Sequence, residues 1–174
     1  QAKLEAVKRV FPADHASSEP LIAERAELIA QGNDPTDLPE AYKVYDADGE
    51  FVGYAVLGKG LGFQDEIKLM LGLSPDLRQI RGLHVIRDSE TPGLGTKIRP
   101  GEEWPQQFFE YAPGQHLETE PPLTVVKSER QSPNEVEAIT AATISAQAVT
   151  DIVNESKASL ESYLHEHMDQ GGGQ

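Results

Sequence analysis

The sequence predicts an α+β fold, an antiparallel sheet built from hairpins with flanking helices. Two successive hairpins in the middle of the chain favour antiparallel pairing over a parallel βαβ arrangement, which needs long crossovers. Apolar residues near the C-terminus recur at helical spacing, and a shorter stretch with the same period opens the chain. A length of 174 residues suits one domain with a sizeable core and is short for two.

The N-terminal part is expected to be helical. Apolar residues recur at helical spacing up to Pro12: Leu4, Val7 and Phe11. A second helix is expected to start after residues 17–18, with Pro20 in its first turn, and to end at Gly32. Residues 1–40 are therefore expected to form an N-terminal helical segment.

The middle of the chain is expected to form the sheet. Four runs with strand character follow one another: residues 41–45, 51–57, 67–73 and 80–87. Residues 46–49 contain the Asp and Gly typical of a hairpin turn, and residues 74–76 are typical of another. Apolar residues alternate along residues 67–73, which predicts that one face of this strand is buried.

The C-terminal half is expected to close with a long helix. A loop rich in Gly and Pro covers residues 88–100, followed by a short helix over 104–111 and a short strand over 123–127. The last helix carries an apolar stripe: Ile144, Ala148, Val149, Ile152, Val153, Leu160 and Leu164. Residues 167–174 are expected to form a flexible tail.

The composition excludes several classes of protein. The net charge is 15 − 29 = −14 and the pI about 4.7, which argues against binding nucleic acid or an anionic lipid surface, because both require clustered Lys and Arg. The absence of cysteine excludes disulfides and thiolate chemistry. No apolar run approaches the roughly 18 residues that span a bilayer. Because the first residue is Gln1, we expect a fragment or a processed chain.

The composition of residues 89–97 (SETPGLGTK) suggests a loop with more than a structural role. They follow a predicted strand directly, Pro92 stiffens the backbone, and Gly93 and Gly95 allow the chain to approach a ligand closely. A surface turn is an equally good interpretation of this spacing. The segment is not a phosphate-binding P-loop, because Lys97 lacks the preceding glycine and the following Ser or Thr.

Residues 137–145 (EAITAATIS) are expected to open the last helix. They place the hydroxyls of Thr140, Thr143 and Ser145 among small residues at a helix N-terminus, where free N–H groups and the helix dipole favour a phosphate. The small residues before Thr143 leave room for a bulky group to reach its hydroxyl. The alternative interpretation is that Thr140 is a simple N-cap.

The chain resembles the FMN-binding domain family of the RnfG and NqrC subunits, which belong to ion-pumping membrane oxidoreductases. The resemblance lies in two motifs that follow one another along the chain, Glu90–Gly95 (ETPGLG) and Thr140–Thr143 (TAAT). In that family ETPGLG is followed, some tens of residues later, by an Asp, two residues and S/T-G-A-T before a helix. The likeness extends from about Tyr54 to Val153, so residues 41–166 are expected to form the FMN-binding domain.

Two positions depart from the family pattern. Glu137 stands where Asp is usual, which keeps the charge but lengthens the reach. Ala141 stands where Gly is usual, a small change that a helix start is expected to tolerate.

The resemblance implies that Thr143 carries FMN through a phosphoester bond. It also implies a set of FMN-contacting residues: Glu90, Thr91, Pro92, Gly93, Leu94, Gly95, Lys97, Thr140, Ala141, Ala142, Ile144 and Ser145. Leu94 would give apolar contact to the isoalloxazine ring. No residue is expected to act as a general base or nucleophile on a soluble substrate, since the flavin supplies the redox chemistry.

The resemblance also implies a cellular setting. The chain would be an electron-transfer subunit, rather than a free-standing enzyme, at the extracytoplasmic (periplasmic) face of the inner membrane, with an N-terminal anchor helix absent from this sequence. Its partners would be the other subunits of the complex and a flavin transferase during maturation, not nucleic acid.

Other interpretations stay open at this point. The domain could belong to an extracytoplasmic reductase that acts on a small acceptor, or it could be a non-redox module whose threonines cap a helix. Metal sites are not expected. Asp46 and Asp48 lack the later Glu of a calcium loop, and His165 and His167 are expected in a solvated tail.

Overall fold

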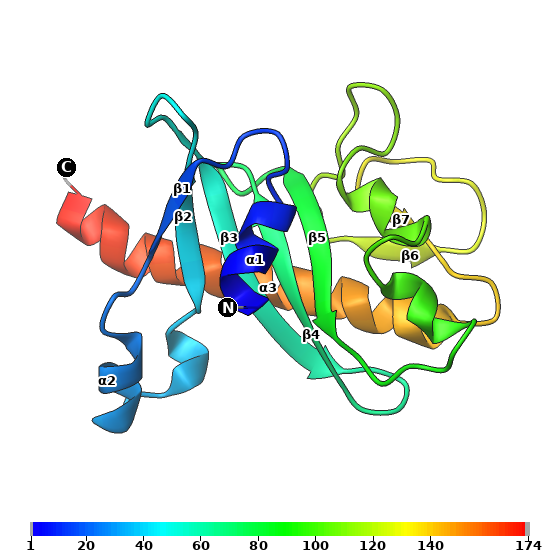
Figure 1. The fold of residues 1–174 in the computed structure, drawn as a ribbon, viewed down its shortest axis with the longest axis horizontal. Coiled ribbons are helices and arrows are strands. Elements are labelled where there is room, and N and C mark those ends of the chain that lie inside the picture. The colour runs from blue at the N-terminus through cyan, green and yellow to red at the C-terminus, as the bar shows by residue number, and fades with distance from the viewer. Residues whose placement is uncertain (1, 173–174) are drawn as a thin grey trace.

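The computed structural model describes the backbone of residues 2–172 and the side chains up to His167. Its centre is a five-stranded antiparallel sheet in the order β1-β2-β3-β4-β5 (Figure 1). The strands are β1 (Ser17–Pro20), β2 (Ala41–Tyr45), β3 (Phe51–Leu61), β4 (Glu66–Leu73) and β5 (Ile80–Arg87). The predicted α+β class and antiparallel sheet are confirmed, and β2 and β5 have the predicted bounds.

The first forty residues contain a strand that was not predicted. Helix α1 (Ala2–Arg9) forms as expected, but Ser17–Pro20 is strand β1, and helix α2 is confined to Arg25–Ala30. Strand β1 pairs with β2 at the edge of the sheet, with Pro20 opposite Tyr42. An edge strand tolerates proline because the missing N–H can face away from the ladder. A short 3₁₀ helix, η1 (Pro35–Asp37), then leads to β2.

The sheet is buried on both faces, not on one as the alternation in β4 predicted. One core cluster contains Ile67, Leu69 and Leu71 and packs against the C-terminal helix. The other contains Met70, which packs with residues of α1 such as Val7. Figure 1 shows α1 in front of the sheet and the long helix behind it. The residues between the alternating leucines are therefore also core positions.

The remaining elements, apart from the last helix, are grouped at the β5 side of the sheet. They are the 3₁₀ helices η2 (Gly95–Ile98) and η3 (Trp104–Phe108) and the parallel pair β6 (Thr124–Val126) and β7 (Glu135–Glu137). Helix α3 (Thr143–Gly172) begins beside them and runs behind the sheet to its β1–β2 side (Figure 1). The helix predicted over residues 104–111 is thus a shorter 3₁₀ helix. Helix α3 starts later than expected and runs to Gly172, while residues 173–174, predicted as tail, lie outside the described residues.

Glycines in β3 allow α3 to approach the sheet closely. A Cβ atom on Gly60 would lie 2.6 Å from Cγ1 of Ile152, a buried residue of α3. A side chain at Gly58 would likewise meet Ser156 and Ile152. These strand glycines therefore serve helix–sheet packing.

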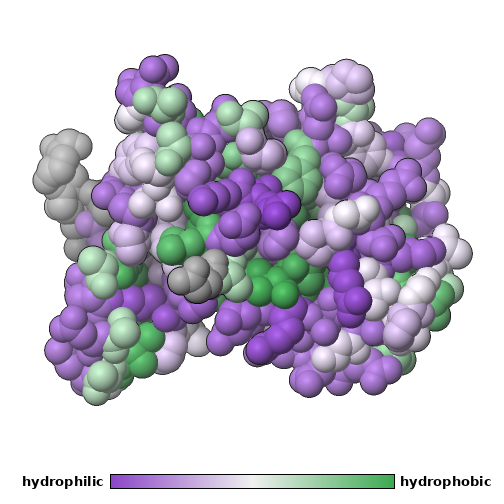
Figure 2. Space-filling model, in the orientation of Figure 1, coloured by the Kyte–Doolittle hydropathy of each residue, from purple (hydrophilic) through white to green (hydrophobic). Residues whose placement is uncertain are grey.

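The surface on the α1 side is mostly hydrophilic, with small apolar patches beside α1 (Figure 2). Within residues 2–172, no helix combines the length and the apolar character that crossing a membrane requires.

The replacement Gly60→Val tests the close packing of α3 on β3. Valine favours strands by propensity, but its side chain would overlap Ile152, so we expect the free energy of unfolding to fall by about 1–3 kcal/mol. Lys59→Val adds the same residue at the neighbouring exposed position and should change stability by less than about 0.5 kcal/mol. Urea denaturation measures both. Equal stability of the two variants would contradict the packing described here.

Candidate functional site

Three segments that are distant in sequence meet around one buried carboxylate. These are the β3–β4 turn, the loop that follows β5, and the start of α3, at the lower right of Figure 1. The side chain at their centre is Glu90, which is only 4% exposed. Its carboxylate accepts a hydrogen bond from the Ser145 hydroxyl and, at 3.1 Å to each oxygen, from the backbone N–H of Phe63. The structure thus brings the two motifs together through Glu90 and Ser145.

Glycines make this junction possible. A Cβ atom on Gly95 would lie 2.6 Å from the Ser145 Oγ and 2.7 Å from the Glu90 Cβ. A Cβ atom on Gly62 would lie 2.7 Å from Cδ1 of Ile67 and would also meet the Glu90 carboxylate. Backbone without side chains at these two positions lets the loop and the β3–β4 turn close over Glu90.

The loop after β5 has its own internal support. Gly93 has a φ of +78°, its N–H donates to the Thr96 hydroxyl at 3.0 Å, and the N–H groups of Leu94 and Thr96 both donate to the Thr91 carbonyl. Pro92 and Gly93 are exposed at the tip. The loop is therefore an ordered turn rather than a free surface segment.

An ion pair anchors the beginning of the same loop. Arg99 donates to both carboxylate oxygens of Asp88, at 2.8 and 3.1 Å, and Asp88 also accepts the N–H of Glu90 at 3.0 Å. Burial by itself raises the pKa of Asp88, but these hydrogen bonds outweigh it and hold the pKa below its ordinary value. Asp88 is therefore ionised at neutral pH and fixes the backbone that carries Glu90.

The start of α3 presents Thr143 at its first position. Thr143 is half-buried, Ala142 is buried, and Thr140 and Ile144 are exposed. Because the first N–H groups of a helix have no intrahelical acceptor, the N–H groups beside the Thr143 hydroxyl are available to an anion. The alternative interpretation, in which Thr140 is the N-cap of the helix, is wrong, since α3 begins three residues later.

Ala141 has an unusual backbone conformation, with a φ of +66°. The Ala142 N–H donates to the Ile139 carbonyl at 3.0 Å, which makes Ala141 the third residue of a tight turn. A positive φ at this position is the signature of a type II turn, where glycine is favoured. The sequence predicted that a helix start would tolerate the change from Gly to Ala. This prediction is wrong, because Ala141 precedes the helix and has left-handed backbone.

A cavity of about 600 Å³ adjoins this turn, between η2, η3 and the segment from β7 to α3. Its lining combines Lys97 and Thr140 with aromatic and acidic side chains, among them Trp104, Tyr111 and Glu137. Lys97 and Thr140, which the resemblance assigned to the cofactor site, thus face one cavity.

Glu137 holds the wall of this cavity together. The Trp104 indole N–H donates to the Glu137 carbonyl at 2.6 Å, the Glu137 N–H donates to Gln107, and the Tyr111 hydroxyl donates to the Glu137 carboxylate. Burial, followed by the hydrogen bond to Glu137, raises the pKa of Tyr111 to about 12. Tyr111 therefore stays protonated as the donor, and Glu137 braces η3 against β7.

Sequence reasoning did not identify three of these contributors. Phe63, Gly62 and Tyr111 are not among the residues that the resemblance assigned to the site. All three lie within the stretch from Tyr54 to Val153 that resembles the family, but neither of the two motifs contains them. The partner of Tyr111 is 26 residues away and has no signal in spacing.

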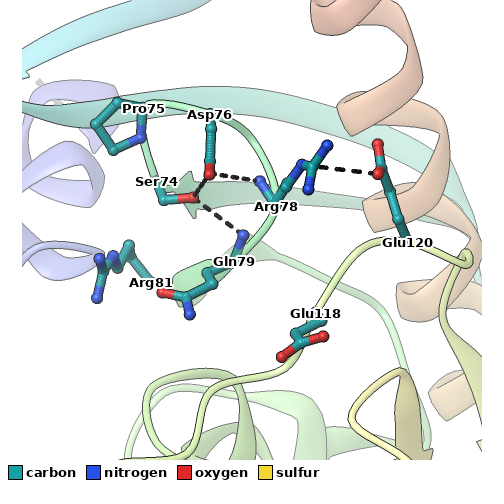
Figure 3. A pocket seen from close by; sticks show the side chains of 8 residues that line it. All are labelled: Ser74, Pro75, Asp76, Arg78, Gln79, Arg81, Glu118 and Glu120. Atoms are coloured by element: carbon teal, nitrogen blue, oxygen red, sulfur yellow. Dashed lines mark hydrogen bonds and ion pairs between the residues drawn. The ribbon is translucent and has the colours of Figure 1, made fainter.

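A second cavity, of about 620 Å³, lies at the β4–β5 turn (Figure 3). Several of its polar groups bond to one another: the Ser74 hydroxyl donates to Asp76 at 2.7 Å, the Gln79 N–H donates to Ser74, and Arg78 pairs with Glu120. It contains no residue of the two motifs, so we place the candidate site at Glu90 and Thr143.

Two of the residues considered for metals make contacts within the chain. Asp46 accepts the N–H groups of Asp48 and Glu50 within its turn, and His167 stacks on Tyr163. Among the described residues, no group of three or more His, Cys, Asp or Glu side chains could hold a metal ion.

Comparison with known proteins identifies the family. The model of the FMN-binding domain matches residues 62–157, a span that includes both motifs. This chain belongs to the FMN-binding domain family.

Two relatives carry similar sequences. The G subunit of the Na(+)-translocating ferredoxin:NAD(+) oxidoreductase complex of Acetobacterium woodii is 39% identical over 124 residues, which cover 70% of this chain and 55% of the relative. The G subunit of an ion-translocating oxidoreductase complex of Methanosarcina acetivorans is 36% identical over 151 residues, 86% of this chain and 70% of the relative. This chain therefore spans just over half the length of the first relative.

Two solved structures share the fold. The C subunit of the Na(+)-translocating NADH-quinone reductase of Parabacteroides distasonis has a TM-score of 0.65 at 16% identity, covering 93% of this chain and 90% of that one. NqrC of Shewanella oneidensis has a TM-score of 0.56 at 20% identity, covering 71% and 61%.

Removing the central carboxylate should loosen the junction of the three segments. Because Glu90→Ala leaves the Ser145 hydroxyl and the Phe63 N–H without their charged acceptor, we expect the free energy of unfolding to fall by about 1.5–3 kcal/mol. The exposed Glu102→Ala serves as the matched control and should change stability by less than about 0.5 kcal/mol. Denaturant titration compares them, and equal stabilities would show that Glu90 does not hold the site.

Ala141→Gly tests the backbone strain before α3. Relief of a left-handed alanine, about 1–2 kcal/mol, should exceed the entropic cost of glycine, about 0.5–1 kcal/mol, so the variant should be more stable by about 0.5–1 kcal/mol. Ala138→Gly, where φ is not positive, should instead destabilise the protein. Thermal and urea unfolding measure the change in stability of each variant. A change in the same direction for both variants would contradict backbone strain at Ala141.

Proposed function

We propose that this chain carries FMN bonded through a phosphoester to Thr143 and acts as an electron-transfer subunit of an Rnf- or Nqr-type ion-translocating membrane oxidoreductase. The observation that carries the proposal is the buried hydrogen bond between Ser145 and Glu90. It holds the ETPGLG loop against the helix start, where the half-buried residue Thr143 stands.

The residues present fit a flavin phosphate. The N–H groups at the start of α3 and the positive end of its dipole would bind the phosphate oxygens beside Thr143. The exposed Thr140 hydroxyl and the Lys97 ammonium, which line the adjoining cavity, offer further donors. The Ser145 hydroxyl already donates to Glu90, so it supports the phosphate site by fixing the loop.

FMN, when bound, supplies redox chemistry that amino-acid side chains lack. The task left to this chain is to hold the group in place. Glycine backbone at Gly93 and Gly95 would allow close contact with the flavin, and the partly exposed Leu94 would offer it an apolar surface. A covalent tether at Thr143 would prevent loss of the cofactor.

The proposed setting follows the two relatives, each of which is the G subunit of an oxidoreductase complex. The partners would be other subunits of such a complex, and a flavin transferase would attach FMN during maturation. The domain would work on the extracytoplasmic face of the membrane, held there by an N-terminal anchor.

Mass spectrometry of the denatured chain tests the attachment. After coexpression with a flavin transferase, the wild type should gain the mass of one FMN less one water and stay yellow in denaturant, because the phosphoester survives unfolding. Thr143→Ala removes the attacking oxygen and should lose the gain completely, while Thr143→Ser restores a hydroxyl. Thr124→Ala, at an exposed threonine of β6, is the matched control and should keep the flavin. A Thr143→Ala chain that retains the added mass would contradict the proposal.

A further inference from the structure

The face of the sheet on which α1 lies is covered over only part of its length. Helix α1 has 8 residues and is about 12 Å long, whereas the 11 residues of β3 span about 36 Å. A Cβ atom on Gly53 would meet Phe11, just after α1, and the cluster under the helix extends along the sheet to Leu57 and Met70. Figure 1 shows the lower ends of β3 and β4 continuing beyond α1, so the helix leaves this end of the face uncovered.

The next row of the uncovered face carries three cations on three adjacent strands. Lys59 of β3 is directly opposite Lys68 of β4, and Lys68 is directly opposite Arg87 of β5. Each lysine lies two residues beyond the last covered pair and therefore points to the same face. Arg87 reaches Glu66, two residues before Lys68, at 3.2 Å. We refer to Lys59, Lys68 and Arg87 as the basic row.

The charges of the basic row are poorly balanced within the chain. Lys59 and Lys68 form no ion pair with any of the residues that the structure describes. Like charges directly opposite each other on neighbouring strands destabilise a sheet. The chain has only 15 Lys and Arg against 29 Asp and Glu, yet three of the 15 stand side by side here. An external group with negative charge would remove this repulsion.

Apolar side chains flank the basic row. Leu61, two residues beyond Lys59 on the same face of β3, is 78% exposed. Leu57 and Ile86 are half-buried at the edge of the cluster under α1. Figure 2 shows hydrophilic side chains below the apolar patch beside α1. The uncovered end of the face thus combines cations with apolar surface, as the contact surfaces of proteins commonly do.

We infer that the basic row and Leu61 form a docking surface for an acidic segment of another protein subunit. Carboxylates of that segment would pair with Lys59 and Lys68, and its apolar side chains would cover Leu61. The inference rests on the proposed function, because the partner is taken to be another subunit of the same oxidoreductase complex.

Charge complementarity favours a protein segment over an anionic membrane surface. A flat anionic surface would attract the basic row but repel the rest of a chain with a net charge of −14. A protein segment can instead place a few carboxylates opposite individual cations. Attraction within a Debye length, about 8–10 Å, then acts on the basic row and leaves the more distant carboxylates of this chain screened.

The docking surface borders the candidate site. Leu61 directly precedes Gly62, in the turn that closes over Glu90, and Arg87 directly precedes Asp88, which anchors the loop carrying Glu90. A subunit docked on the basic row would therefore lie beside two of the three segments that meet at Glu90. Electron transfer between subunits requires such proximity, because its rate falls steeply with distance.

Charge reversal tests the inference in membranes that contain the assembled complex. Lys59→Glu and Lys68→Glu should each lower the fraction of this chain that co-purifies with the other subunits in detergent by about fivefold or more. Each should keep or raise the urea midpoint of the purified chain, because like-charge pairs become opposite-charge pairs. Lys127→Glu, at an exposed lysine without an ion pair, is the matched control and should leave co-purification unchanged.

Zero-length crosslinking of the wild-type complex identifies the partner. A water-soluble carbodiimide joins an amine to a carboxylate only where the two touch. Mass spectrometry should therefore map Lys59 or Lys68 to an Asp or Glu of another subunit of the complex, and should find no such link from Lys127.

Three results would overturn the inference. The first is co-purification of both reversal variants at the level of Lys127→Glu. The second is loss of co-purification together with a lowered urea midpoint in both variants, which would point to damaged folding. The third is full co-purification of both variants with loss of binding to phosphatidylglycerol vesicles, which would assign the basic row to the membrane. A wild-type chain that co-purifies with no other subunit would overturn the proposed function as well, whereas these three results leave the proposed function standing.

Discussion

The architecture of the site depends on one buried carboxylate. Glu90 is almost fully covered, and burying a charge is unfavourable unless hydrogen bonds replace water. The Ser145 hydroxyl and the Phe63 N–H supply those bonds, and Gly62 and Gly95 leave the space for them. Because the donors come from separate segments, satisfying Glu90 requires the β3–β4 turn, the loop after β5 and the start of α3 to assemble together.

The sheet was predictable because its strands carry local signals. Strands β2 and β5 have the predicted bounds, and the turns between strands are rich in Asp, Gly and Pro. Strand β1 was missed because Ser17–Pro20 has no apolar alternation, and it becomes a strand by pairing with β2. The burial of Met70 was missed because alternation cannot show that α1 covers the second face.

The sequence pointed to a candidate site through two motifs, but it gave no signal of the hydrogen bonds between them. The two motifs identified the loop and the helix start, yet Glu90 and Ser145 are 55 residues apart, and no spacing rule pairs them. The conformation of Ala141 was hidden because alanine gives no sign of left-handed backbone, which the family's usual glycine would have shown.

The length of α3 has a mechanical consequence. Its 30 residues correspond to a rod of about 45 Å that begins at Thr143 and lies along the back of the sheet. A group fixed to the first turn of this rod shares the rigidity of the whole core, since Ile152 and Leu160 hold the rod along its length. The distance from such a group to a neighbouring redox centre would then be set by how the entire body docks, and not by the swing of a loop.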